Sequence, residues 1–576
     1  MLLIESGMIL IALLAAFLLP NACSSIFAPI ERRLAWLAGR RRLAVLAVGA
    51  AALGLRAAVL PVLPIPYPGL QDEFSYQLMA DTFAHVRLTN PTHPLWIHLE
   101  SLLVIHTPTY CSMYYPGQGI FMALGQVIGG HPFWGVWLSV GLMCAAICWM
   151  LQGWVPPFWA LIGGLLAVIR IGAFSYWADS YWGGAVAALG GALVLGALPR
   201  IKRQQRIGDA LLMGIGFALL VNSRPYESSF FGIPIFLSLL VWMVKTTQET
   251  RRRSLSRFML PLALVTAATG GFMAYYFWRT TGGPLTPPYI VNLRRYAVDP
   301  NFAWLPLRPV PHYNHDAIRR YYAEWDVGTY QAVRTHPLLF TIVKILMLWF
   351  FFLGPLLSFP FLALGFVIPY GKSLADVGPK TRFLAIVCGT TLLGLLLAIP
   401  VNPHYAAPIT AAIYALVVLA MQRVRRWRSG RKHPGLVMVR AIPAAAVALL
   451  FLRVAIPILH LPVVDAAVPQ TWCSPWYHLL SRRGVEIRLR SLPGEHLVLV
   501  HYDPQHDPKE GWISNSSDID GSKIVWAYDM GPQNKELIRY FAGRHVWLVE
   551  PDQNPINLSP YEAPKTFATP SEAANQ

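Results

Sequence analysis

Charged residues are scarce in this 576-residue chain, where Asp, Glu, Lys and Arg together make up 13% of the sequence, against roughly 25% in soluble domains. Several long runs contain no acidic or basic residue at all. These runs are Gly183–Leu198, Leu211–Val221, Phe258–Phe277 and Phe383–Ile399. A helix of a soluble protein needs a polar face, which these runs lack, whereas about 20 apolar residues suffice to cross a bilayer core. The scarcity of charge therefore excludes an all-soluble fold and indicates a polytopic membrane protein.

Cysteine is also scarce, and its placement follows no metal-binding pattern. The six cysteines are scattered along the chain, without the short spaced pairs of a zinc or iron–sulfur site. Most of them lie in apolar runs, where a small buried side chain is the simplest explanation: Cys23, Cys144, Cys148 and Cys388. Cys111 and Cys473 could meet outside the membrane, but nothing in the sequence requires a disulfide between them.

Basic residues outnumber acidic ones, which gives the chain a net charge of +18. The placement of the basic residues nevertheless argues against nucleic-acid binding. They cluster in short segments between apolar runs, a pattern typical of cytoplasmic loops. These clusters are Arg32–Arg42, Arg200–Arg206, Lys245–Arg257 and Arg423–Lys432. We therefore expect these four loops on the cytoplasmic side and no nucleic-acid partner.

If these four loops all lie on the cytoplasmic side, the apolar runs between them predict about 12 membrane crossings. The start, Met1–Pro20, has no basic residue and contains Glu5, so it is expected to be a membrane helix with its N-terminus outside rather than a cleaved signal. The segment Gly117–Gly130 is too short to cross, at about 1.5 Å per residue, and is predicted to lie in the outer interface. The predicted crossings lie near 7–28, 43–63, 135–151, 156–174, 180–198, 207–223, 228–244, 257–278, 337–370, 382–400, 404–421 and 438–459.

The predicted fold is therefore an all-α polytopic membrane protein with a small C-terminal α/β domain. Residues 1–42 form an extra N-terminal membrane helix and a basic cytoplasmic loop, and residues 43–460 form the membrane core. Two long outer loops are expected, at 64–134 and 279–336. Polar residues return at 461–576, with strand-like runs His496–Tyr502, Ile524–Tyr528 and His545–Val549 and a helix-like stretch Asn534–Ala542. The tail from Pro560 is expected to be frayed.

Two adjacent carboxylates, Asp72 and Glu73, follow the second predicted crossing and open the candidate site. Carboxylates at a membrane surface can act as a general base and as a hydrogen-bonding or metal partner. From spacing alone, a solvated pair of loop residues or the cap of a following helix is the commoner explanation.

Three further outer loops carry candidate site residues. Asp179 lies among aromatic residues, where an isolated acid at a membrane face is costly unless it is used. Arg224 precedes Pro225 and can hold a phosphate through two hydrogen bonds, although snorkelling to the interface is an equal alternative. His404 and Tyr405 lie at the outer end of a later crossing. Acidic, cationic and His/Tyr groups on different loops of one face predict a site between helix ends.

These motifs resemble the GT-C superfamily of membrane glycosyltransferases, most closely the branch with the protein mannosyltransferases, the aminoarabinose transferase of lipid A and the RgtA/B/C/D-like transferases. The family's first-loop acidic motif is matched by Asp72-Glu73, and its second acidic residue by Asp179. Its cation before proline is matched by Arg224-Pro225. Two departures are clear: the family's first-loop Pro pair is Pro116-Gly117 here, and its late Arg-Tyr is His404-Tyr405. The resemblance covers roughly residues 43–421.

The resemblance implies a glycosyltransferase, transferring a hexose or pentose from a polyprenyl-phosphate donor to an extracytoplasmic glycan, lipid or protein acceptor with inversion. Asp72 is expected to be the base, with Glu73 and Asp179 orienting the acceptor. Arg224, His404 and Tyr405 are expected to hold the donor phosphate. The enzyme is expected in the cell inner or plasma membrane, with its site on the extracytoplasmic face.

The remaining expectations concern the acceptor, a metal and other functions. Arg319 and Arg320 of the second outer loop could attract an anionic acceptor, or could merely seat that loop on the bilayer. A divalent metal ion is not expected to be obligatory, although Asp72, Asp179 and Glu100 could supply oxygen ligands. The alternative function is a multi-pass transporter or lipid flippase. A third is a binding or scaffold role centred on the C-terminal domain, whose His/Asp-rich loop is best explained by solvated turns.

Overall fold

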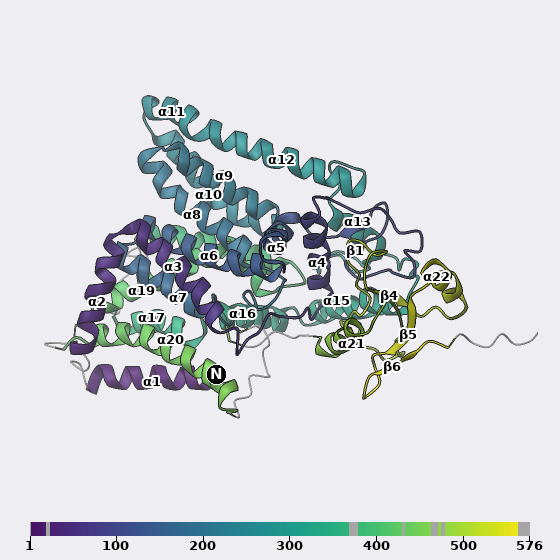
Figure 1. Ribbon diagram of the computed structural model, residues 1–576. Helices are drawn as coiled ribbons and strands as arrows, with labels where there is room; N and C mark the ends of the chain where they lie inside the picture. The colour runs from purple at the N-terminus through teal and green to yellow at the C-terminus, as the bar shows by residue number, and fades with distance from the viewer. Residues whose placement is uncertain are drawn as a thin grey trace, which may run out of the picture.

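The computed structural model describes residues 2–18, 24–367, 378–428, 432–461, 471–473 and 479–562. Most of the apolar runs form helices that lie together in one body (Figure 1). In chain order these are α1 (Leu2–Leu18), α2 (Ser24–Gly39), α3 (Arg41–Ala58), α6 (Phe133–Trp154), α7 (Pro157–Arg170), α8 (Ala185–Gln204), α9 (Ile207–Val221), α10 (Pro225–Lys245), α11 (Gln248–Ser254), α12 (Leu260–Thr281), α16 (Pro337–Phe352), α17 (Gly354–Val367), α18 (Pro379–Leu397), α19 (Thr410–Arg425) and α20 (Pro434–Ile458).

Seven helices of the described chain are long and apolar enough to cross a membrane, or eight if one bent pair counts as a single crossing. Four shorter apolar helices, α1, α7, α9 and α17, lie where other crossings are predicted. The protein is a multi-pass membrane protein by this measure, while the twelve-crossing topology stays a prediction. The first predicted crossing is misplaced, because its helix ends at Leu18 and a second helix, α2, occupies residues expected to be largely loop.

Two sets of ion pairs, one buried at Glu5 and one partly exposed at Glu31, join the N-terminal helices to the body. Glu5 of α1 accepts a hydrogen bond from Arg170 of α7, with Oε1 2.9 Å from Nη1. Glu31 of α2 is bound by Arg425 and Arg440, the latter at 3.0 Å. A buried charge is costly unless it is paired, so these contacts fix α1 and α2 against α7, α19 and α20.

The first long loop, residues 64–134, contains two helices and a short β-hairpin. The helices are α4 (Gln71–Ala84) and α5 (Pro116–Gly129), and the strands are β1 (Val104–Ile105) and β2 (Cys111–Ser112). The helix predicted at 117–130 is thus confirmed as a helix of 14 residues. Proline at its first position explains where it begins, since the missing N–H would have no partner there. Cys111 and Cys473 are both buried free thiols, so no disulfide joins them.

The second long loop, residues 279–336, carries α13 (Pro288–Tyr296), α14 (Asp316–Arg319) and α15 (Asp326–Thr335), with a π-helical turn over Arg320–Trp325. The axis then turns by 108° into α16. Proline at the start of α16 favours this break, because it disfavours helical geometry in the residue before it. The turn separates the loop from the membrane helices.

The C-terminal region forms a four-stranded sheet in the order β4-β3-β5-β6. The predicted strands and helix are confirmed as β3 (His496–Val500), β4 (Ile524–Tyr528), β5 (His545–Glu550) and α22 (Asn534–Tyr540). Strand β3 pairs in parallel with β4 and β5, and its five residues are all buried. The sequence pattern did not predict α21 (Leu480–Ser491) or β6 (Asn557–Pro560), which pairs antiparallel to β5. Residues 563–576, most of the predicted frayed tail, lie outside the described residues.

The C-terminal domain packs on the first long loop at one end of the molecule (Figure 1). Apolar side chains from both, such as Leu103 and Val498, belong to one buried cluster. Polar contacts add to it: the Gln71 amide donates to the carbonyl of Pro508 at 2.9 Å. The domain therefore covers α4, the helix that begins with the acidic motif.

Candidate functional site

Glu73 caps the helix in which it lies. Its Oε2 accepts hydrogen bonds from the backbone N–H of Gly69 at 2.7 Å and of Leu70 at 3.3 Å. Its Oε1 accepts from the backbone N–H of Tyr181 at 2.9 Å. A carboxylate in the third helical position reaches back to unpaired N–H groups in this way. The fully buried Glu73 thus joins the start of α4 to the segment between α7 and α8.

Asp72, one residue earlier, lies in a different environment. Its carboxylate accepts a hydrogen bond from the hydroxyl of Tyr114, and Trp182 supplies a second side-chain hydrogen bond. Burial raises the pKa of Asp72, although these hydrogen bonds and the charge of Arg224 oppose the rise. A carboxylate with a raised pKa is a stronger proton acceptor than an ordinary one.

Arg224 supplies the positive charge next to Asp72. It is the N-cap of α10, and its guanidinium carbon lies 4.5 Å from the centre of the Tyr405 ring. None of the described residues forms a hydrogen bond or ion pair with this guanidinium. Its donors therefore remain free for a ligand, and the adjoining helix N-terminus adds partial positive charge. An anion fits this position.

His404 lies buried beside Tyr405 in the 3₁₀ turn that leads into α19. Its backbone N–H donates to the hydroxyl of Tyr176 at 2.9 Å, so the hydroxyl proton points to His404 Nδ1, 2.8 Å away. This arrangement places the ring proton of a neutral His404 on Nε2. Nε2 has no hydrogen-bond partner among the described residues. A buried, unused N–H donor is thus held near the Arg224 side chain.

Asp179 is buried in the segment between α7 and α8, where it pairs with Arg56 of α3 at 3.5 Å. Arg56 also donates to the carbonyl oxygens of Ala178 at 3.0 Å and Leu63 at 2.8 Å. The pair therefore fixes the segment that carries Trp182. Asp179 and Glu73 thus both hold neighbouring segments in place, Asp179 by an ion pair and Glu73 by hydrogen bonds to the backbone. Asp72 instead interacts electrostatically with Arg224.

The residues proposed as metal ligands are not gathered. Glu100 is buried elsewhere in the first long loop, where it accepts hydrogen bonds from Tyr296 at 2.6 Å and Asn314 at 3.0 Å. In the part of the chain that the structure describes, no three His, Cys, Asp or Glu side chains form a group that could hold a metal ion. Asp72, Asp179 and Glu100 therefore do not form a common ligand set.

The two acceptor candidates have partners within the protein. Arg319 is exposed and pairs with Asp316 and Glu324, each at 2.7 Å. Arg320 also contacts Asp316, and its guanidinium donates to the carbonyl of Asp503 in the C-terminal domain at 3.2 Å. Arg320 thus joins the second long loop to the C-terminal domain, and Arg319 alone presents its side chain to solvent.

The sequence did not identify three residues that complete the site. Tyr114 and Trp182 bind Asp72, yet each lies in an aromatic stretch where nothing in the pattern distinguishes it from its neighbours. Asp326 begins α15, and its charge interacts with those of Asp299 and Asp72. It brings a further carboxylate toward Asp72 from the second long loop. Its spacing in the sequence carries no signal of this contact.

No protein-family model and no curated protein matches the sequence. Among solved structures, the chain is similar to the oligosaccharyltransferase of Archaeoglobus fulgidus tethered to an acceptor peptide, with 10% identity, a TM-score of 0.47, and coverage of 89% of this chain and 69% of that one. Against the apo form of that enzyme, the match covers 62% of the enzyme's length.

A second similarity is to ArnT from Cupriavidus metallidurans bound to undecaprenyl phosphate. Its identity is 12%, its TM-score 0.46, and the match covers 88% of this chain and 92% of that one. Both enzymes are GT-C glycosyltransferases, the superfamily that the sequence motifs resemble. Because the TM-scores are below 0.5, these similarities do not establish a function, which is therefore argued from the chemistry of the site.

Proposed function

We propose that this protein is a membrane glycosyltransferase that moves a sugar from a polyprenyl-phosphate donor to an acceptor on the extracytoplasmic face, with inversion at the anomeric carbon. The observation that carries the proposal is the electrostatic interaction of Asp72 with Arg224. A carboxylate of raised pKa interacts with a guanidinium that stacks on Tyr405 and forms no hydrogen bond or ion pair with a described residue. The first suits a base and the second an anionic leaving group.

Asp72 would accept the proton of an acceptor hydroxyl as its oxygen attacks the anomeric carbon. The new carbon–oxygen bond forms while the bond from that carbon to the donor phosphate breaks, and the electron pair leaves with the phosphate. Tyr114 and Trp182 hold the carboxylate in one orientation through their hydrogen bonds. A single displacement of this kind inverts the anomeric configuration.

Arg224 would neutralise the charge that develops on the departing phosphate. Its planar fork of donors matches phosphate oxygens, and Tyr405 fixes the plane of the fork by lying beneath it. The Nε2–H of His404 would be a second donor, at the position where the family that the sequence motifs resemble has an arginine. Stabilising charge as it develops is usually the largest catalytic term.

Glu73 and Asp179 act, in this proposal, as positioning residues. Glu73 holds the first turn of α4 and therefore the backbone of Asp72. Asp179 and Arg56 hold the segment that presents Trp182 to Asp72. Asp326 is the better candidate for orienting the acceptor, because its charge interacts with that of Asp72 from the second long loop. No step is assigned to a metal ion, since the described residues offer no three-ligand set.

The alternative, a transporter, would need ionisable groups free to change partners within the membrane. Three arginines lie within or at the ends of predicted crossings, and each has a fixed partner. Arg56 binds Asp179, Arg170 binds Glu5, and Arg453 donates to the carbonyl of Cys473 at 2.6 Å. Arg170 joins two helices, and Arg56 and Arg453 join their helices to non-helical segments. These fixed contacts favour a static scaffold around an enzyme site.

A comparison of glycans and glycolipids from cells with and without the protein tests this function and identifies donor and acceptor together. We expect one sugar to be missing without the protein, to return with the wild-type chain, and to stay absent with Asp72→Asn. An Asp507→Asn variant, which changes an exposed Asp of the C-terminal domain, should restore it. Full restoration by Asp72→Asn would remove Asp72 as the base.

A further inference from the structure

A cavity lies on the opposite face of α4 from Asp72. Its volume is about 540 Å³, within the range of roughly 300–1,000 Å³ typical of small-molecule sites. Four residues of α4 line the cavity, and their spacing puts them on one face of the helix: Phe74, Gln77, Leu78 and Asp81. Asp72 does not line it. Helix α4 is therefore a wall shared by two sites.

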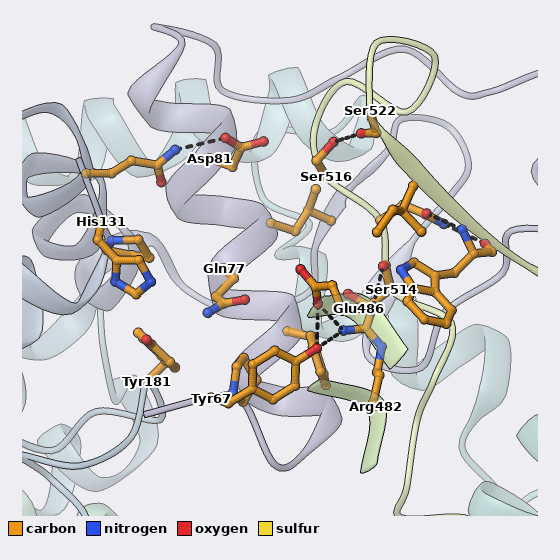
Figure 2. A pocket seen from close by; sticks show the side chains of 18 of the residues that line it. Tyr67, Gln77, Asp81, His131, Tyr181, Arg482, Glu486, Ser514, Ser516 and Ser522 are labelled. Atoms are coloured by element: carbon orange, nitrogen blue, oxygen red, sulfur yellow. Dashed lines mark hydrogen bonds and ion pairs between the residues drawn. The ribbon is translucent and has the colours of Figure 1, made fainter. Parts of the chain in front are cut away.

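The C-terminal domain supplies the facing wall, and the residues before α6 close the side (Figure 2). Gln77 projects between His131 on one side and Glu486 and Ser514 on the other. The cavity thus exists because the domain packs on the first long loop, and it would be lost if the two separated.

Each charged group around the cavity already has a hydrogen-bond or ion-pair partner. Arg490 binds Glu486 at 2.8 Å, and Arg482 binds the same carboxylate at 3.4 Å. The Lys523 ammonium donates to the carbonyl of Arg490 at 2.7 Å. Asp81 accepts hydrogen bonds from an amide side chain and a backbone N–H, both at 2.9 Å. A charged ligand would have to break these contacts, so the lining does not select for one.

The groups with unused hydrogen-bonding capacity are neutral. The side chain of Gln77 and the hydroxyl of Ser514 form no hydrogen bond with any described residue. His131 Nδ1 accepts from the backbone N–H of Phe133 at 3.2 Å, which leaves the Nε2–H of its neutral form free. An amide, a hydroxyl and an imidazole N–H together can donate to and accept from several hydroxyl groups.

The aromatic rings in the lining, those of Phe74, Trp526 and Tyr181, are almost wholly buried and form a packed wall. Trp526 and Phe74 lie 4.4 and 4.7 Å from the guanidinium of Arg482, which fixes their orientation. Tyr181 donates its hydroxyl proton to the carbonyl of Pro66 at 2.8 Å. The unused groups of the lining are therefore neutral hydrogen-bonding groups, and an uncharged ligand rich in hydroxyls matches them.

We propose that this cavity is a binding site for a neutral oligosaccharide, distinct from the site of Asp72 and Arg224. The inference stands on the cavity's own lining and does not require the proposed transfer reaction. If that reaction holds, the cavity would bind glycan units remote from the reacting hydroxyl, with α4 between the two sites.

The test is binding of free neutral trisaccharides of glucose, mannose, galactose and arabinose to the purified full-length chain, measured by saturation-transfer NMR and calorimetry. We expect at least one to bind saturably and Gln77→Leu to weaken it about tenfold, the loss of one or two buried hydrogen bonds. Ser514→Ala, a smaller change, should weaken it about threefold. Gln533→Leu, which alters an exposed glutamine outside the cavity, should bind as the wild type does.

Asp72→Asn should bind the same trisaccharide with unchanged affinity, even where it abolishes transfer, so failure of one proposal is distinguishable from failure of the other. Absence of binding by all four sugar types would overturn the inference. Wild-type affinity in both Gln77→Leu and Ser514→Ala would also overturn it, as would tighter binding of a glucuronate-containing trisaccharide than of any neutral one.

Discussion

Arg224 and Tyr405 lie 181 positions apart in the sequence, yet the guanidinium carbon of the first is 4.5 Å from the ring centre of the second. The contact joins the start of α10 to the turn before α19, beside the carboxylate of Asp72. A cation held over a ring keeps its edge N–H groups free. The pair thus presents an oriented, unoccupied set of donors to an anion.

Replacing Arg224 should weaken donor use more than acceptor use. Arg224→Gln is expected to raise the KM for a polyprenyl-phosphate sugar by about 10- to 100-fold, because charged hydrogen bonds contribute about 1.5–3 kcal/mol. The control is Arg279→Gln, since Arg279 also lies over a tyrosine, Tyr275, but at an exposed position. Equal donor KM values for the two variants would show that Arg224 does not bind the donor phosphate.

Tyr114→Phe should change the pH dependence of transfer. The Tyr114 hydroxyl stabilises the ionised form of Asp72, so its loss raises the pKa of Asp72 further above its ordinary value. A base works above its pKa, and the acid limb of kcat/KM should therefore move to higher pH. Tyr115→Phe, whose hydroxyl forms no hydrogen bond with the described residues, should leave the limb in place. An unmoved limb in Tyr114→Phe would show that Asp72 is not the titrating base.

Replacing Glu73 should lower both thermal stability and activity, whereas replacing Asp72 should lower activity alone. Glu73→Ala leaves three buried N–H groups without an acceptor, at a cost of about 1–3 kcal/mol for each group that finds no water. We expect a clear fall in melting temperature together with lost activity. Asp72→Asn should keep the wild-type melting temperature and lose activity alone. A Glu73→Ala chain that melts as the wild type does would contradict the capping role.

Replacing Arg319 and replacing Arg320 should also have different effects on thermal stability and on the acceptor KM. Arg320→Gln removes a contact with the C-terminal domain and should lower thermal stability, whereas Arg319→Gln should not. If Arg319 attracts an anionic acceptor, its replacement raises the acceptor KM severalfold and leaves the donor KM unchanged. An unchanged acceptor KM in stable Arg319→Gln would remove this loop from the substrate path.

Removing metal ions with a chelator tests the expectation that transfer needs no divalent ion. Full activity in excess chelator is expected, because Asp72, Asp179 and Glu100 are not gathered and no other three-ligand set occurs among the described residues. Measuring transfer after dialysis against chelator, with and without added Mg²⁺ or Mn²⁺, decides the matter. Loss of activity that only the added ion restores would show that a metal takes part.

The sequence predicted what depends on local pattern and on sidedness. Short apolar runs located β3, β4 and β5, and the length of 117–130 identified α5. These predictions are confirmed because composition and length act within short stretches of chain. The placement of Asp72, Arg224 and Tyr405 on one membrane face stays a prediction, although the structure stacks Arg224 on Tyr405.

Tertiary contacts decided the rest. Asp72 and Glu73 are adjacent carboxylates, yet one caps a helix and the other faces Arg224, because successive side chains leave a helix in different directions. Arg319 and Arg320 diverge for the same reason, one into solvent and one onto the C-terminal domain. The contacts of Tyr114 and Asp326 depend on how two distant loops fold over α4, which no spacing encodes.

Transfer of a labelled sugar from a polyprenyl-phosphate donor by the purified protein, compared between the wild type and Asp72→Asn, tests the central claim most directly. The acceptor would be the glycan or glycolipid fraction of cells that lack the protein. We expect the wild type to transfer label and Asp72→Asn to be slower by about 100-fold or more, the usual loss when a general base is removed. Near wild-type turnover by Asp72→Asn, or saturable solute uptake into proteoliposomes with no sugar transfer, would contradict it.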